Sequence, residues 1–185
     1  MGTQSLYHFK PIGMVGDVLI PLNELKATLP EVYSEQVKKY EGREKLLEKK
    51  IPILDCLWND VLHFSPVNPQ KIIDIWRERD WLRENTRSRL PIAVYRVPIE
   101  LLKHEPIVCF QSFSTEPGKY DPSQDKFWRF EASGYEEHDS VPAKQIEVWE
   151  SDFKADRRFF WYSHTMHVLA RQRIDTRECE LISCE

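Results

Sequence analysis

Residues 61–69 read VLHFSPVNP, and this stretch decides where the chain changes from strand to helix. Apart from one histidine, its first four residues are β-branched, aliphatic or aromatic, which favours a strand over 61–64. Pro66 and Pro69 end that strand because proline has no amide hydrogen for a sheet ladder. Asn68-Pro69 predicts a helix start, since asparagine caps free amides and proline fits the first helical turn. A strand is therefore expected to lead directly into a helix.

On both sides of this stretch, short apolar runs and amphipathic segments follow each other. We expect helices at 21–26, 31–40, 43–49 and 142–153. We expect strands at 6–9, 91–97, 107–113, 127–130, 159–170 and 178–183. Short helices followed by several strands indicate an α+β fold. A length of 185 residues fits a single domain over 1–185, with 114–158 as a loop-rich insertion that forms a lid or an acceptor-recognition face.

The composition excludes several classes of protein. The chain has 26 basic and 30 acidic side chains, and the net charge of −4 argues against stable binding of duplex nucleic acid. A hydrophobic content of 41% excludes a disordered chain. No uncharged stretch approaches the roughly 18 to 20 apolar residues that span a bilayer. Because the segment 1–9 shows no secretory signal, we expect a cytoplasmic protein, without a membrane partner, whose four cysteines are reduced.

Common catalytic motifs are missing from the sequence. The six glycines form no G-x-G, which argues against Rossmann and P-loop nucleotide sites, and there is no G-x-S-x-G elbow. His164 and His167 are three apart and would point to opposite faces of the expected strand, so we expect no metal site there. Asp55, Asn59 and Asp60 predict a capped turn rather than an acid–base pair.

One locally basic stretch remains, with five arginines between residues 77 and 89 and tryptophans at 76 and 81. Guanidinium groups beside aromatic faces suit a single-stranded nucleic acid, which offers phosphates and stackable bases. Three acidic residues in the same stretch dilute its charge, which favours a solvated helix face with ion pairs.

Three segments, in order, resemble the DarT-type ADP-ribosyltransferase toxins: Leu6-Tyr7-His8-Phe9, a helical segment with Arg43, and residues 58–69. In that family an early strand carries a histidine, a helical region carries an arginine, and a strand ending in Ser-Pro opens the next helix. The likeness continues less tightly through 91–113 and 157–182. It implies an ADP-ribosyltransferase-like split β-sandwich with flanking short helices, which holds NAD in a cleft between two small sheets.

The resemblance also implies roles for particular residues. His8 would hydrogen-bond the nicotinamide ribose, and Arg43 would steady the phosphates of the cofactor and the developing charge. His63 or Phe64 would lie near the aromatic group that packs against nicotinamide. The expected NAD-binding residues are Tyr7, His8, Arg43, His63, Phe64 and Ser65. Breaking the glycosidic bond of NAD passes through an oxocarbenium-like state, so such a site must hold the ribose and the leaving group in place.

One position departs from the family pattern. Where the family strand reads A-E-V-L-V, this chain has MHVLA at 166–170, so His167 replaces the catalytic glutamate. A neutral imidazole accepts a hydrogen bond but lacks the negative charge of a carboxylate. The expected catalytic residues are His8, Arg43 and His167.

Three functional hypotheses follow from this resemblance. The first is a NAD-dependent ADP-ribosyltransferase-like protein that acts on nucleic acid or protein. The alternative is a catalytically silent module that binds NAD, ADP-ribose or another partner. A phosphotransferase-like activity of His8 and His167 ranks below both, because the arginines expected for it cannot be placed.

Overall fold

The computed structural model describes residues 4–104, 106–113, 121–132, 140–157 and 159–185. The chain forms an α+β fold with several small antiparallel sheets, which confirms the predicted class. One sheet has the order β1-β6-β11, formed by Ser5–Phe9, Ile92–Pro98 and Glu180–Cys184. The other has the order β5-β9-β7-β8, formed by Leu62–Phe64, His167–Ala170, Val108–Ser112 and Asp125–Arg129. Two short ribbons are β2-β10 (Val18–Leu19 and Ile174–Asp175) and β3-β4 (Lys50–Ile51 and Cys56–Leu57).

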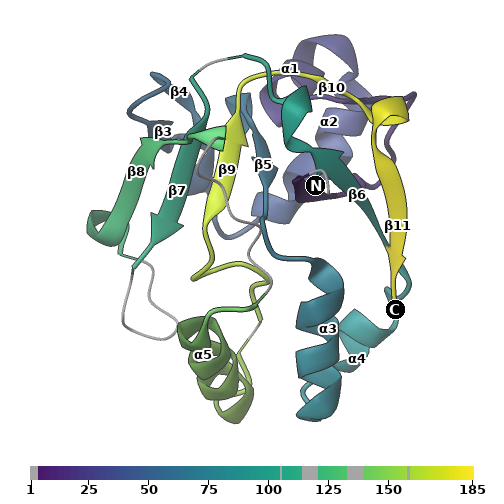
Figure 1. The fold of residues 1–185 in the computed structure, drawn as a ribbon, viewed down its shortest axis with the longest axis vertical. Coiled ribbons are helices and arrows are strands. Elements are labelled where there is room, and N and C mark those ends of the chain that lie inside the picture. Colours follow the sequence, from purple (N-terminus) through teal and green to yellow (C-terminus); the bar gives the residue numbers. More distant parts are fainter. Residues whose placement is uncertain (1–3, 105, 114–120, 133–139, 158) are drawn as a thin grey trace.

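Short helices surround the two larger sheets. The α-helices are α1 (Leu22–Thr28), α2 (Pro30–Val37), α3 (Pro69–Glu78), α4 (Glu84–Arg87) and α5 (Ala143–Lys154). The 3₁₀ turns are η1 (Lys38–Tyr40), η2 (Glu44–Leu47), η3 (Trp58–Asp60), η4 (Ile99–Leu101), η5 (Pro122–Gln124) and η7 (Thr176–Glu178). Figure 1 shows the two larger sheets side by side, with α3 and α5 at their lower end. None of the described helices is long and apolar enough to cross a membrane.

The two larger sheets share one apolar core. Leu6 of β1 and Val97 of β6 are fully buried in the same cluster as Phe64 of β5 and Val168 of β9. Burial of such a side chain contributes roughly 1.5 to 3 kcal/mol of stability, so this cluster fixes the sheets against each other. The opposite face of the second sheet is covered by the β3-β4 ribbon and by Trp58.

The helix start predicted at Asn68-Pro69 is confirmed. The side chain of Asn68 accepts a hydrogen bond from the amide of Gln70 at 2.9 Å, and Pro69 is the first residue of α3. Because β5 ends at Phe64, only four residues separate the strand from the helix. Ile72, Ile73 and Trp76 of α3 are then buried against the sheets and α5.

The long strand expected over 159–170 is wrong except for its last four residues, which form β9. The alternating pattern is real, because Phe159 and Trp161 both pack on Trp76, with ring centroids 5.4 and 4.6 Å away. The backbone carbonyl of Phe160 between them, however, has its partner on a helix instead of a neighbouring strand. Trp149 of α5 donates to the carbonyl of Phe160 at 2.8 Å, which replaces a sheet ladder.

The helix expected over 43–49 is also wrong. Gly42 has a positive φ of 75°, and only Glu44–Leu47 form a 3₁₀ turn before β3 begins at Lys50. A turn of this kind ends the helical segment and leaves Arg43 just outside it, with φ −140°. Within the expected insertion 114–158, the structure describes β8 and α5, whereas 114–120, 133–139 and 158 lie outside the described residues.

The basic stretch over 77–89 binds largely to its own chain. Arg83 forms an ion pair with Asp156 at 2.7 Å, and Arg77 donates to the carbonyl of Glu185. The guanidinium of Arg79 lies 5.1 Å from the ring centroid of Trp81. These contacts favour the interpretation of a solvated, ion-paired surface.

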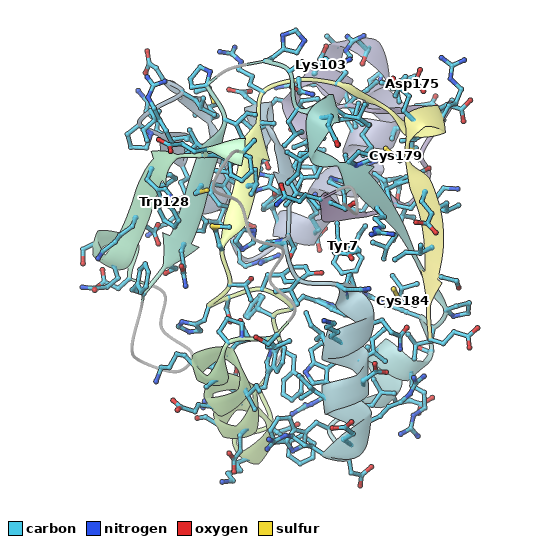
Figure 2. The ribbon with its side chains drawn as sticks, viewed as in Figure 1. Tyr7, Lys103, Trp128, Asp175, Cys179 and Cys184 are labelled. Carbon is cyan, nitrogen blue, oxygen red and sulfur yellow. The ribbon has the colours of Figure 1, made fainter. Side chains whose placement is uncertain are left out.

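All four cysteines are free thiols. Burial raises the pKa of Cys109 to about 12 and that of Cys179 to about 11. Cys179 and Cys184 lie near opposite ends of β11 (Figure 2). Thiols with raised pKa values are poor nucleophiles at neutral pH, so the cysteines are not candidates for nucleophilic catalysis.

Gln145 of α5 holds the segment that precedes β9, and its removal should destabilise the protein. Its buried side chain accepts from the amide of His164 at 2.7 Å and donates to Ser163 at 3.1 Å. We expect Gln145→Leu to lower the free energy of unfolding by about 1–3 kcal/mol, because a buried amide loses its partner. Urea unfolding measures this, with the exposed neighbour Lys144→Leu as control. Equal stability of the two variants would contradict this role.

Candidate functional site

The site begins where the two larger sheets meet. Tyr7 of β1 forms an isolated antiparallel bridge with Ser65, which directly follows β5. The amide of Tyr7 donates to the Ser65 carbonyl at 2.8 Å, and the amide of Ser65 donates back at 2.9 Å. The bridge places the next residue, His8, against Phe64, with ring centroids 5.6 Å apart. In Figure 2, Tyr7 lies between the sheets, above α3.

His8 is a neutral imidazole with a defined tautomer. Its Nδ1 atom lies 2.7 Å from the carbonyl oxygen of Phe9, and because a carbonyl can only accept, Nδ1 carries the proton. Burial lowers the pKa of His8 to about 4, against the hydrogen bond to Phe9 and with a smaller contribution from the charge of Lys39. At neutral pH the Nε2 atom of His8 is therefore a hydrogen-bond acceptor.

His63 and His167 follow the same pattern on β5 and β9. The Nε2 atom of His63 donates to the carbonyl of Trp58 at 2.7 Å, and that of His167 donates to the carbonyl of Tyr162 at 2.9 Å. Burial lowers the pKa of His63 to about 3 and also lowers the pKa of His167. Both rings are therefore neutral, and each keeps its Nδ1 atom as an acceptor.

His63 lies within electrostatic reach of the other two imidazoles. The pKa of His63 is lowered by the charges that His167 and His8 would carry, as well as by burial. As whole residues, all three are half-buried. Among the described residues, no hydrogen bond occupies their second ring nitrogens. Each ring therefore keeps one acceptor nitrogen for a group that donates a hydrogen bond.

Lys39 lies within electrostatic reach of His8 and His63, and Arg43 lies beside Lys39. Arg43 donates to the carbonyl of Lys39 at 2.5 Å, and its guanidinium lies 5.4 Å from the ring centroid of Phe160. Lys39 is exposed, yet surrounding protein and the charge of Arg43 lower the pKa of its ammonium group. The charge of Lys39 in turn lowers the pKa values of His8 and His63. A pair of neighbouring cations of this kind attracts a phosphate or another anion.

Tyr162 connects the segment before β9 to the sheet junction. Its side chain hydrogen-bonds Ser65, its carbonyl binds His167, and burial raises the pKa of its phenol. Its ring lies 6.1 Å from that of His167 in an edge-on geometry. The segment held by α5 therefore orients His167 as well as Phe160.

The structure brings together four of the residues that the sequence singled out, and it buries three others. His8, Arg43, His63 and His167 are half-buried; His63 lies within electrostatic reach of His8 and His167, and Arg43 lies within reach of Lys39. Tyr7, Phe64 and Ser65 are buried, and they join the sheets rather than present side chains to a ligand. Sequence reasoning missed three further residues here: Lys39, Phe160 and Tyr162. No signal in the sequence marks them, because each lies in a stretch of similar charged or aromatic residues.

Among the described residues, a surface hollow of about 500 Å³ is lined by residues outside the candidate site. Some of its polar groups pair with each other, as Arg173 with Glu24 and Asn23 with Asp60. Asp60 also accepts from the amide of Leu57 at 2.7 Å, as expected for a capped turn. Within the described residues, no group of three or more His, Cys, Asp or Glu side chains is placed to hold a metal ion.

Comparisons of the chain with protein-family models, with curated proteins and with solved structures found no match. The geometry of the site itself therefore carries the functional argument.

The neutral histidines predict that the protein loses stability in acid. The pKa of His63 is about 3 in the folded state and 6.5 in an unfolded chain, so acidification first protonates the unfolded chain. The contribution of His63 is complete above about pH 6.5 and falls by about 1.4 kcal/mol per pH unit between there and about pH 3. Urea unfolding at several pH values should show that His63→Gln loses less free energy of unfolding per pH unit than the wild-type protein. The exposed His104→Gln is the control, and a variant slope equal to that of the wild type would contradict the assignment.

Proposed function

We propose that this site binds NAD or ADP-ribose and that the protein is a divergent ADP-ribosyltransferase-like protein of the DarT type. The observation that carries the proposal is a set of three neutral imidazoles, each with an acceptor nitrogen that no described residue hydrogen-bonds. His8 and His63 among them lie within electrostatic reach of Lys39, which neighbours Arg43. A dinucleotide offers the matching groups, because its riboses carry hydroxyl donors and its diphosphate is anionic. The two larger sheets, joined between β1 and β5, would then be the halves of the split β-sandwich.

Each group in the site has a role in this proposal. The Nε2 atom of His8 accepts a hydrogen bond from a hydroxyl of the nicotinamide ribose. Arg43 and Lys39 bind the diphosphate, and charge-assisted bonds of this kind are roughly twice as strong as neutral ones. Phe160, whose ring lies beside Arg43 and is 42% exposed, offers an aromatic face to a base or to nicotinamide.

The chemistry of transfer would follow from positioning. The bond between nicotinamide and C1′ of the ribose breaks, nicotinamide leaves with the bonding electrons, and an acceptor nucleophile attacks the cationic ribose. Holding the ribose hydroxyls and the leaving group in one geometry lowers the barrier of that step. His167 stands where the family has its glutamate, and its Nδ1 atom can accept a hydrogen bond or a proton. The acceptor would be a single-stranded nucleic acid or a protein.

Titration calorimetry with NAD and with ADP-ribose tests the binding step. Lys39→Gln and Arg43→Gln should each weaken binding by roughly tenfold or more, because a hydrogen bond to a charged group contributes roughly 1.5 to 3 kcal/mol. Lys38→Gln is the matched control, since this neighbouring ammonium already pairs with Glu35 at 2.6 Å. Absence of heat at about millimolar ligand with folded wild-type protein would overturn the proposal.

A second candidate function is a catalytically silent binding module of the same fold. The observation that favours it is His167, which is neutral and tied to the Tyr162 carbonyl, so it supplies no negative charge to a ribose cation. Such a module would bind NAD or ADP-ribose through the same cations and imidazoles without turning it over.

Labelled NAD separates the two candidates. The protein is incubated with NAD labelled in its adenylate part and with single-stranded DNA, RNA or a protein mixture. Incorporation of label that disappears in His8→Ala and Arg43→Ala, but persists in Lys38→Gln, identifies a transferase. Binding in the calorimeter without any incorporation identifies the silent module.

A further inference from the structure

Lys49 lies in an aromatic box next to the candidate site. Its ammonium nitrogen lies 4.1 Å from the ring centroid of Phe110, 4.2 Å from that of Trp58 and 5.7 Å from that of Phe127. The same nitrogen forms an ion pair with Asp125 at 2.8 Å, and these side chains are only 14% and 4% exposed. An ammonium group is attracted to the faces of aromatic rings, most strongly where solvent is excluded.

Two rings of this box each pack against one imidazole of the candidate site. The indole of Trp58 packs on His63 with centroids 4.4 Å apart, and the ring of Phe110 lies 5.6 Å from that of His167. Trp58 and Phe110 also contact each other edge-on at 4.9 Å. The ammonium group of Lys49 therefore contacts both rings against which His63 and His167 pack, and these two histidines lie on different strands.

Stability alone gives little reason for this ion pair. The surrounding cluster is apolar, with Ile51, Val108 and Leu169 fully buried. A buried ion pair costs desolvation energy that offsets most of its attraction, and an apolar pair of the same volume is often as stable. The contacts that an apolar residue would not reproduce are those of the ammonium group with the two rings.

We propose that Lys49 is a positioning residue of the candidate site: its ammonium group fixes the rings of Trp58 and Phe110, and these rings orient His63 and His167. This role rests on the proposed function only in that the two imidazoles face the ligand. The backbone supports the same arrangement, because the amide of Trp58 donates to the carbonyl of Lys49 at 2.7 Å.

Lys49 and Lys39 affect the pKa values of different histidines, and a measurement can separate their effects. The charge of Lys49 lowers the pKa of His167, in addition to burial and against the hydrogen bond to Tyr162. The charge of Lys39 lowers the pKa values of His8 and His63, and His63 also responds to His8 and His167. Removal of Lys49 should therefore change the pKa of His167, whereas removal of Lys39 should change the pKa values of His8 and His63.

The test is a titration of the histidine rings by NMR in the protein without ligand. The main variant is Lys49→Met combined with Asp125→Asn, since removing Lys49 alone would leave a buried carboxylate without its cation. We expect the His167 midpoint to move upward, the His63 ring resonances to shift as Trp58 loses its contact, and the His8 midpoint to stay. Lys49→Arg, which keeps a cation over the rings, should retain the wild-type His167 midpoint. Lys39→Met is the matched control, and it should raise the His8 and His63 midpoints and leave that of His167 unchanged.

Other outcomes would overturn the proposal. A folded double variant with unchanged His63 and His167 resonances would show that Lys49 acts only as a filler of the core. Should the double variant fail to fold, the NMR spectrum of the wild-type protein still tests the proposal. The two rings must shift the side-chain protons of Lys49 upfield, and the absence of this shift would overturn the proposal. The measurements need no NAD, so a failure to bind NAD would overturn the proposed function and leave the result on Lys49 intact.

Discussion

Two backbone hydrogen bonds between Tyr7 and Ser65 are the contact on which the site depends. They join the edge strand β1 of one sheet to the edge strand β5 of the other, with N···O distances of 2.8 and 2.9 Å. Unpaired backbone groups at these buried edges would cost stability, so the bridge both closes the core and sets the register of the two strands. His8 and His63 lie one and two residues from the bridge, and their positions follow from it.

Desolvation then decides the chemistry that the site can perform. Burial makes the charged imidazolium unfavourable, so His8, His63 and His167 are neutral, and a carbonyl oxygen selects the tautomer of each ring. Neutral imidazoles accept hydrogen bonds from hydroxyl groups, while Lys39 and Arg43 supply the positive charge. Under the proposed function, the imidazoles would bind ribose hydroxyls and the cations would bind phosphates. His167 is uncharged, so this site lacks the negative charge that a carboxylate would supply.

Local signals in the sequence predicted those elements whose partners are nearby in the chain. Asn68 and Pro69 start α3 because capping needs only the next few residues. The long strand over 159–170 was wrong because alternation of side chains does not say what pairs with the backbone, and here the partner is Trp149 of α5. Four positions of the candidate site, three histidines and one arginine, were predicted from the family resemblance. Lys39, Lys49 and Tyr162 could not be found, because a buried role for a lysine or tyrosine depends on distant neighbours.

The sequence by itself determined the α+β class, the strand-to-helix change at 61–69 and the reduced state of the cysteines. These features depend on composition and short-range sterics. Only the tertiary structure decided that β1 meets the end of β5, that His63 lies within electrostatic reach of His8 and His167 on other strands, and that Lys49 lies among aromatic rings. Contacts between Lys49 and Asp125, which are 76 positions apart, arise from the packing of whole sheets, and no local pattern records that packing.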